Sequence, residues 1–307
     1  MPAVHLSGKT IVVTGVTGQV AGPVATALAG DNEVIGAARF RDGPARHRLE
    51  EAGVRCVPID LVSGDVADLP ADADYVLNFA VAKTNDWELD LRANSGGLAY
   101  LMEHHQHASA FVHCSTTGVY KPLGHHVFAE DDALGDNHGV WPFLRTYSIC
   151  KIAAEGTARW GADRFDLPTT VARLSVPYGD RGGWPAIHLE MMINGSDIPV
   201  HIDAPSIYHP LHEDDIIAMV PGLIGAATTP ATTVNWGGDQ AVSVEEWCGY
   251  LSELTGVPAR FNPTAETIDS VAIDLARMHQ LIGTTTVDWK DGMRRMVAAR
   301  HPELLST

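Results

Sequence analysis

Features typical of disulfide-stabilised, zinc-binding or membrane proteins are scarce in this sequence. Only four cysteines occur among 307 residues, and no two of them form a CxxC pair. Neither a disulfide framework nor a zinc knuckle is therefore expected, and a reducing compartment, the cytoplasm, is the expected location. Residues 1–9 contain no long apolar run, and no later stretch has the length and apolar character of a membrane span. No membrane association is expected.

Positive charge is scarce as well. The chain has 21 Lys and Arg against 38 Asp and Glu, a formal net charge of −17, and no basic cluster interrupts this excess. Such a charge repels a phosphate backbone, so nucleic acid is not an expected partner. Histidines number 15, but the HExxH motif does not occur among them. We therefore expect no metal site.

What the sequence does contain is an alternation of short β-branched runs and longer helical patterns over its first 180 residues. This alternation predicts an α/β protein with a Rossmann-type, doubly wound parallel sheet covered by helices on both faces. The expected strands are Thr10–Thr14, Glu33–Ala38, Val54–Val57, Tyr75–Phe79, Ala110–Cys114 and Thr169–Leu174. The expected helices are Gln19–Ala29, Leu89–His107 and Phe143–Trp160.

The alternation weakens after Pro177, and this change indicates how the chain is divided. We expect an NAD(P)-binding domain over residues 1–176 and a smaller, mostly helical substrate-binding lobe over residues 177–307. One later strand, Thr232–Trp236, is expected to return to the first domain. The lobe would cover the carboxyl edge of the sheet, where ligands bind in such folds.

A glycine-rich turn follows the first expected strand. It reads Thr14-Gly15-Val16-Thr17-Gly18-Gln19-Val20-Ala21-Gly22 and runs directly into a helical pattern. Gly15 permits a tight turn, and Gly18 lets the backbone approach a pyrophosphate. Glycines also end many strands for steric reasons alone, but a strand before and a helix after favour a phosphate-binding loop.

The end of the second expected strand bears on the choice of cofactor. An acidic residue there favours NAD, but this chain has Ala38 followed by Arg39, which can pair with a 2′-phosphate. The sequence therefore predicts NADP, with NAD possible, unless Arg39 is only a solvated strand end. Asp60, after the third strand, is expected near the adenine amine or in a simple turn.

Tyr147 and Lys151 are four residues apart in an expected helix and therefore share one face. A nearby ammonium lowers the pKa of a phenol, which would let Tyr147 act as acid and base near neutral pH. Thr116 ends an expected strand, where its hydroxyl could reach a substrate oxygen. The three residues together favour hydride-transfer chemistry over a chance spacing on a solvated helix.

These motifs together resemble the extended short-chain dehydrogenase/reductase superfamily, in its epimerase/dehydratase-like branch. The resemblance implies that Thr116 is the catalytic Ser/Thr, that Tyr147 is the proton donor or acceptor, and that Lys151 also holds the nicotinamide ribose. Relatives often dimerise through two long helices, so a homodimer is expected. Besides Tyr147 and Lys151, the expected cofactor-binding residues are Gly15, Thr17, Gly18, Gln19, Val20, Arg39, Asp60, Leu61, Phe79, Ala80, Val81 and Val176.

Two departures from the family pattern narrow the expected chemistry. Dehydratases of the family carry an Asp-Glu pair after the catalytic Thr, where this chain has Thr117 and Gly118. Tyr208 stands where sugar-nucleotide enzymes tend to have an arginine, so a diphosphate would lack a cation. The substrate is instead expected to contact a largely aromatic set, namely Thr117, His138, Trp141, Tyr178, Trp184 and Tyr208.

The leading interpretation is an NADP-preferring ketone reductase or alcohol dehydrogenase acting on a small, apolar or aromatic carbonyl or alcohol. One alternative is an epimerase of a sugar or nucleotide sugar, which keeps its cofactor and returns the hydride to the opposite face. Another is a cofactor-binding regulator without turnover. The Thr116, Tyr147 and Lys151 set speaks against the regulator, because a sensor needs no activated phenol.

Overall fold

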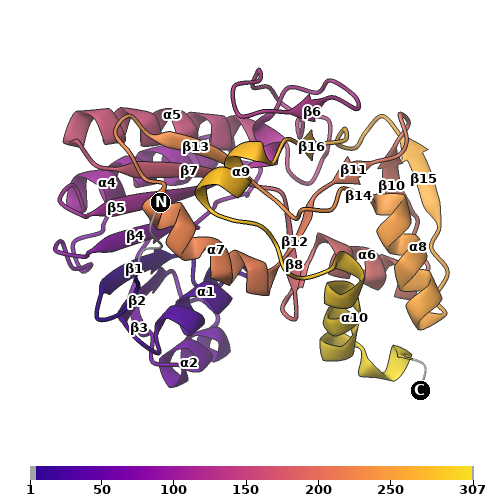
Figure 1. Cartoon of the computed structure of the whole chain (residues 1–307), viewed down its shortest axis with the longest axis horizontal. Coiled ribbons are helices and arrows are strands. Elements are labelled where there is room, and N and C mark those ends of the chain that lie inside the picture. Colours follow the sequence, from indigo (N-terminus) through magenta and orange to yellow (C-terminus); the bar gives the residue numbers. More distant parts are fainter. Residues whose placement is uncertain (1–4, 306–307) are drawn as a thin grey trace.

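Seven parallel strands form the central sheet of this protein, whose computed structural model describes residues 5–305 (Figure 1). The strand order is β13-β7-β5-β4-β1-β2-β3. It reverses between β1 and β4, which is where ligands bind in doubly wound sheets. The predicted Rossmann-type fold is confirmed. The strands are β1 (Thr10–Thr14), β2 (Glu33–Ala38), β3 (Arg55–Pro58), β4 (Tyr75–Asn78), β5 (Ala110–Thr116), β7 (Thr169–Leu174) and β13 (Thr232–Trp236).

Helices cover both faces of the sheet, because alternate strand residues point to opposite sides. Val12 packs with α4 (Gly97–His104) and α5 (Tyr147–Phe165). Ile11 and Val13 belong to the cluster on the other face, with α1 (Ala21–Leu28) and α7 (Glu213–Gly225) (Figure 1). A further helix, α2 (Gly43–Glu51), follows β2 and was not predicted. Its local signals were present, since Asp42 caps Ala45 and Pro44 occupies the first turn.

Helix boundaries differ from expectation on the α4 and α5 face. The expected helix Leu89–His107 is divided into α3 (Trp87–Leu91), a π-helical turn η1 (Arg92–Gly96), and α4. The wide turn contains Asn94, whose side chain accepts from Ala82 N and donates to Ala82 O. Such turns commonly accompany functional sites. In this protein the turn lets Asn94 hold the loop that follows β4.

The C-terminal region is largely helical, as predicted, with short strands between the helices. Its further helices are α6 (Trp184–Ile193), α8 (Val244–Thr255), α9 (Ala276–Leu281), α10 (Trp289–Arg300) and η3 (Pro302–Leu304). Its short strands are β8 (Val176–Gly179), β9 (Gly182–Gly183), β10 (Ile198–His201), β11 (Ile207–Tyr208), β12 (Pro210–His212), β14 (Val242–Ser243), β15 (Phe261–Thr264) and β16 (Ala272–Ile273). Strand β16 pairs with β6 (Val127–Phe128), a short strand that follows the 3₁₀ turn η2 (Thr117–Val119). A domain boundary at residue 176 stays a prediction.

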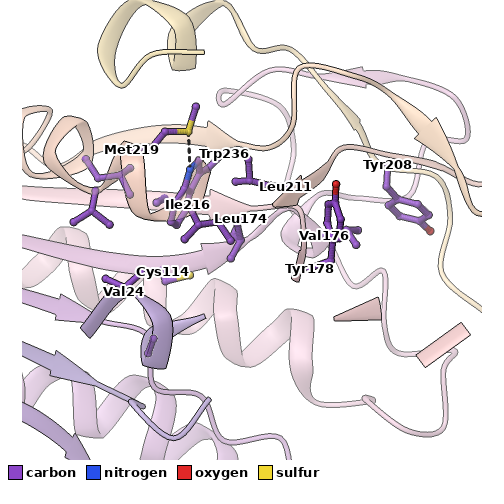
Figure 2. Packing of buried hydrophobic residues seen from close by; sticks show 14 of the residues in the cluster. Val24, Cys114, Leu174, Val176, Tyr178, Tyr208, Leu211, Ile216, Met219 and Trp236 are labelled. Atoms are coloured by element: carbon purple, nitrogen blue, oxygen red, sulfur yellow. Dashed lines mark hydrogen bonds between the residues drawn. The ribbon is translucent and has the colours of Figure 1, made fainter. Parts of the chain in front are cut away.

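One buried apolar cluster joins the sheet to the lobe (Figure 2). It includes Val24 of α1 and Cys114 of β5, together with Tyr208 of the lobe. Trp236 of β13 is fully buried, and its indole Nε1 donates to the Met219 sulfur of α7 at 3.3 Å. Because this core is continuous, the lobe is fixed over the carboxyl edge of the sheet.

Candidate functional site

A cavity of about 750 Å³ runs along the carboxyl edge of the sheet, from the glycine-rich turn to the lobe. The three expected catalytic residues, Thr116, Tyr147 and Lys151, all line it. So do all the other expected cofactor-binding residues: Gly15, Thr17, Gly18, Gln19, Val20, Arg39, Asp60, Leu61, Phe79, Ala80, Val81 and Val176. Of the expected substrate-binding residues, Thr117, His138, Trp141, Trp184 and Tyr208 line it.

Tyr178 is the exception, and its expected contact with substrate is corrected. It is buried in β8, its ring lies edge-on to His212, and its hydroxyl donates to Trp289 O at 3.3 Å. The strand pairs with β12 and β9 and carries Tyr178 beneath α10. The sequence could not show this direction, because it depends on a helix that lies more than 100 residues later in the chain.

The glycine-rich turn has the shape and the free amides that a pyrophosphate requires. Gly15 has a φ of +73°, and a Cβ there would be 2.9 Å from the Ala80 backbone, so only glycine fits. Helix α1 follows with no side-chain cap on its N-terminus and no acidic residue in its first turn. Its amide groups and dipole therefore suit an anion. The residues present fit a nicotinamide dinucleotide.

The far end of the cavity, toward the second strand, carries two cations. Phe40 has a left-handed φ of 47°, and Arg39 and Arg41 on either side of it both line the cavity. A smaller adjoining hollow of about 370 Å³ is bordered by both arginines and by Asp60. Asp60 also accepts from Val62 N at 3.0 Å, so it closes a turn as well as lining the cavity.

Tyr147 is the first residue of α5, and Lys151 lies one turn further along it. The Lys151 ammonium donates to Cys114 O at 2.7 Å, and burial lowers its pKa. Burial also raises the pKa of Tyr147 to about 12, although a hydrogen bond with Thr116 opposes the rise. Lys151 is not among the groups that shift the pKa of this phenol in the protein without cofactor, and removal from water decides the direction of the shift.

The lobe end of the cavity is aromatic and apolar. The rings of Trp184 and Tyr208 have centroids 5.0 Å apart, and Trp141 lies 6.4 Å from Trp184. Among the described residues of the lobe, no lysine or arginine lines the cavity. Four further lining residues, which the sequence analysis missed because they carry no motif, are Leu144, Ile187, Ile268 and Val271.

A buried carboxylate that the sequence analysis missed fixes the start of α5. Asp90 is fully buried and accepts from the backbone N–H groups of Thr84 and Asn85 and from the hydroxyl of Thr146, the last at 2.6 Å. The Asn85 side chain in turn accepts from Arg145 N at 2.9 Å. The loop after β4 and the segment before Tyr147 are thereby tied together.

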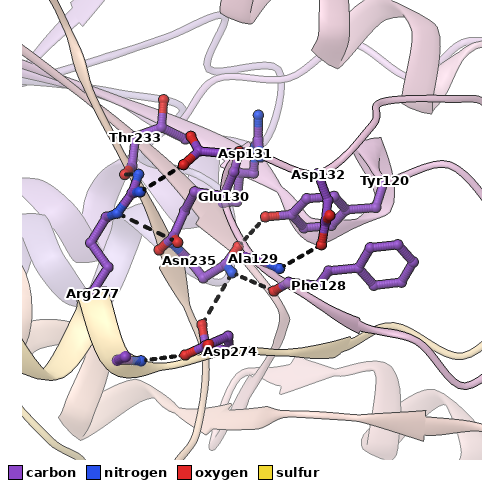
Figure 3. Close-up of polar contacts among 12 residues, drawn as sticks. Tyr120, Phe128, Ala129, Glu130, Asp131, Asp132, Thr233, Asn235, Asp274 and Arg277 are labelled. Carbon is purple, nitrogen blue, oxygen red and sulfur yellow. Dashed lines mark hydrogen bonds and ion pairs between the residues drawn. The ribbon is translucent and has the colours of Figure 1, made fainter.

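A second polar network holds the segment that follows Thr116 (Figure 3). The Tyr120 hydroxyl donates to the side chain of Asn235 in β13, which donates to Phe128 O at 2.9 Å. Arg277 of α9 pairs with Asp131 at 3.2 Å and with Glu130 at 3.5 Å. The turn that follows Thr116 is therefore anchored to the sheet and to the lobe.

Between residues 5 and 305, the structure has neither a metal-binding cluster nor a membrane-spanning helix. No group of three or more His, Cys, Asp or Glu side chains is arranged to hold a metal ion. In the same part of the chain, the helices are too short or too polar to span a bilayer.

Residues 11–196, more than half of the chain, match the profile of the NAD dependent epimerase/dehydratase family. The chain belongs to this family. A search of curated proteins found no match.

Several solved structures share the fold of this chain over almost its whole length. UDP-glucuronic acid 4-epimerase from Bacillus cereus, with UDP-glucuronic acid and NAD, is 20% identical with a TM-score of 0.78, covering 94% of this chain and 98% of its own. UDP-glucose 4-epimerase from Thermotoga maritima, with UDP-glucose, is 18% identical with a TM-score of 0.81, covering 96% and 99%. UDP-N-acetylglucosamine 4-epimerase from Methanobrevibacter ruminantium, with UDP-N-acetylmuramic acid, is 13% identical with a TM-score of 0.82, covering 97% and 99%.

The prediction of a ketone reductase or alcohol dehydrogenase was wrong. The similar structures include several sugar-nucleotide epimerases, one of them with NAD and UDP-glucuronic acid, which favours the epimerase alternative. The reason for the error is chemical. Removing a hydride from a secondary alcohol is the first half of both reactions, so Thr116, Tyr147 and Lys151 cannot distinguish them.

Proposed function

We propose that this protein is an NAD(P)-dependent epimerase that inverts a hydroxyl-bearing carbon of a sugar. The observation that carries the proposal is the similarity of almost the whole chain to UDP-sugar 4-epimerases. Thr116, Tyr147 and Lys151 line the same cavity as the glycine-rich turn, as hydride transfer to a nicotinamide cofactor requires. The nicotinamide, when bound, would take a hydride from the substrate carbon and return it to the opposite face. The chain has to move one proton and keep the ketone from leaving.

Tyr147 is the group that we assign to the proton. Its pKa of about 12 keeps the phenol protonated at neutral pH, so it has to lose its proton before it can act as a base. A cationic nicotinamide and the Lys151 ammonium would both stabilise the phenolate and bring its pKa closer to neutrality. The Thr116 hydroxyl accepts from Gly118 N at 3.1 Å, and its own proton, which the hydrogen bond with Tyr147 uses here, would be donated to the substrate oxygen instead.

The aromatic end of the cavity would hold the sugar ring between the two hydride transfers. Aromatic side chains such as Trp141, Trp184 and Tyr208 offer flat apolar surfaces against which the C–H faces of a sugar can pack. Such contacts are not directional, so they can retain a ketone while it presents its other face. Thr116 and Tyr147, which lie beside this aromatic end, then receive the same oxygen again.

For the cofactor we propose a preference for NADP over NAD. Arg39 and Arg41 border the hollow beside the adenosine end of the cavity, together with Asp60, Asp65 and Asp68. Ala38 places no acidic side chain at the end of β2 itself, so the two arginines are the groups nearest to that strand end that can pair with a 2′-phosphate. The left-handed Phe40 between them turns both arginines to this hollow. Several of the similar solved structures contain NAD, so this preference would distinguish the chain from them.

The substrate of such an epimerase is either a nucleotide sugar or a sugar without a diphosphate. A nucleotide sugar is favoured by the similar structures, which contain UDP-sugars. A sugar without a diphosphate is favoured by the described lobe, which brings no lysine or arginine to the cavity, since a buried diphosphate needs cationic partners.

We also propose a homodimer in a reducing compartment such as the cytoplasm. Trp87 of α3, Tyr100 of α4 and Trp160 of α5 are 47, 50 and 54% exposed, and α5 contacts both of the other helices. A second copy of the chain would cover these aromatic side chains. All four cysteines are unpaired thiols, in keeping with such a compartment. Light scattering should give twice the chain mass.

The epimerase proposal is tested with UDP-glucose, UDP-glucuronic acid and UDP-N-acetylglucosamine, and with glucose and N-acetylglucosamine as the sugars that lack a diphosphate. The protein is incubated with each compound and catalytic NAD or NADP in deuterated water, and products are followed by NMR. We expect an epimer of one compound, formed without net cofactor reduction and without deuterium on the inverted carbon. Stoichiometric cofactor reduction with release of a ketone would contradict the proposal, as would no conversion of any compound.

A further inference from the structure

The His138 ring packs beside Tyr147, in a space that is open because residue 118 has no side chain. A Cβ on Gly118 would lie 2.5 Å from His138 Cε1 and 3.0 Å from Nδ1, so the imidazole fits only because residue 118 is glycine. The ring packs edge to face against Tyr147, with centroids 4.9 Å apart, and lines the cavity. It is 6% exposed. Its position is therefore fixed by packing.

Hydrogen bonds fix the tautomer of this ring. The Ser148 hydroxyl donates its one proton to Gly118 O at 2.6 Å, because a carbonyl can only accept. His138 Nδ1 lies 2.8 Å from the same hydroxyl oxygen and must be the donor in that contact. A neutral imidazole carries one proton, so Nε2 has a free lone pair.

The Nε2 atom is open to the cavity. His138 Nε2 has no hydrogen bond with the described residues. It is nevertheless not one of the fully buried ring nitrogens without a partner, which belong to His105, His113 and His212. Because Nε2 is not fully buried and the His138 ring lines the cavity, this nitrogen must face the cavity. It is an acceptor beside the phenol assigned to the reacting oxygen.

We propose that His138 Nε2 accepts a hydrogen bond from a second substrate hydroxyl, on a carbon next to the one that reacts, so that the substrate is a vicinal diol. This inference rests on the proposed function only for the assignment of the reacting oxygen to Tyr147 and Thr116. It would make His138 a residue that selects for a polyol such as a sugar over a lone alcohol.

The alternative role, that of a second base, is disfavoured by electrostatics. Burial lowers the pKa of His138 to about 4, so the imidazole stays neutral at pH 7 and holds a proton poorly. A group of that kind accepts a hydrogen bond without taking the proton. No carboxylate bonds to Nδ1 to raise the basicity of the ring, since its partner is the Ser148 hydroxyl.

The test uses the full chain, labelled with ¹⁵N-histidine and saturated with the preferred cofactor. Long-range ¹H–¹⁵N spectra, assigned by the signals lost in His138→Gln, should show Nδ1 protonated and Nε2 unprotonated at neutral pH. Adding trans-1,2-cyclohexanediol should shift the Nε2 signal saturably, and cyclohexanol should shift it less. A protonated Nε2, or equal shifts with both probes, would overturn the inference.

A kinetic arm uses the sugar that is converted in the epimerase assay. His138→Phe, which keeps the shape but has no acceptor, should lower kcat/KM about tenfold, mainly through KM, as for the loss of one hydrogen bond. His138→Gln, which restores an acceptor, should recover part of the loss, and an unchanged kcat/KM in His138→Phe would overturn the inference. If the wild type converts no sugar, the epimerase proposal fails, while the ring spectra still decide the role of His138.

Discussion

Glu155 of α5 receives two hydrogen bonds from the guanidinium of Arg173 in β7, at 2.9 and 2.8 Å, and the two side chains are 0 and 2% exposed. Glu155 lies one turn beyond Lys151, and it also accepts from the Ser115 hydroxyl at 2.7 Å. The ion pair therefore ties the helix that carries Tyr147 to β7, and the hydrogen bond from Ser115 ties the same helix to β5, the strand that ends at Thr116. The spacing of the three proposed catalytic residues depends on this buried ion pair.

Glu155→Gln should destabilise the protein by about 3–5 kcal/mol, because it leaves the Arg173 charge buried without its counterion. Urea unfolding would measure the change. Glu253→Gln on the exposed face of α8 is the matched control and should change the free energy of unfolding by less than about 0.5 kcal/mol. Equal stabilities of the two variants would show that the pair contributes nothing.

The same pair predicts a pH dependence of stability. Burial alone would raise the pKa of Glu155, but Arg173, with smaller contributions from Ser115 and Arg159, holds it below the ordinary value of 4.5. A carboxyl whose pKa is lower in the folded state stabilises fully above its unfolded pKa. Wild-type stability should therefore fall as pH drops below about 4.5, and it should fall less steeply in Glu155→Gln.

Tyr147→Phe should reduce turnover by about 10²-fold or more, because it removes the phenol assigned to proton transfer and keeps the ring packed against His138. Cofactor affinity, measured by calorimetry, should change little. Tyr250→Phe on α8 is the control, since this tyrosine lies outside the cavity lining. Near-native turnover in Tyr147→Phe would show that Tyr147 is not the proton donor.

Arg39→Ala should erase most of the preference for NADP over NAD, which we expect to be about tenfold or more from one charge-assisted hydrogen bond. Calorimetric titration of both cofactors would measure it. Arg48→Ala, on the exposed side of α2, removes an equal charge nearby and should leave the ratio unchanged. Tighter binding of NAD than NADP by the wild type would reject the assignment.

Gly118→Ala should displace His138, because the new Cβ would overlap the imidazole at 2.5 Å. We expect a higher KM and a lower melting temperature. Gly249→Ala is the control, since a Cβ there meets nothing within 4 Å on α8, and it should stabilise the protein by about 0.5–1 kcal/mol. Unchanged KM and stability in Gly118→Ala would mean that the ring is not held as described.

Much of the sheet could be predicted from sequence, because its buried strands have a local signature. The bounds of β1, β2, β7 and β13 are as expected, while β5 extends to Thr116 and α2 was missed. The reason for the miss is that α2 is mostly polar and exposed, so no apolar face indicates it, and only its capping residues do. Long-range packing decided that the expected helix Leu89–His107 contains a π-helical turn.

The sequence by itself determined the local parts of the site. A turn that needs Gly15 at positive φ, and a tyrosine and lysine four residues apart on one helix, are encoded within a few residues, because backbone geometry and helical period act over that range. Only the tertiary structure decided the rest. Burial raised the pKa of Tyr147, a distant helix enclosed Tyr178, and Ser148 fixed the tautomer of His138, because desolvation and packing depend on which segments meet in space.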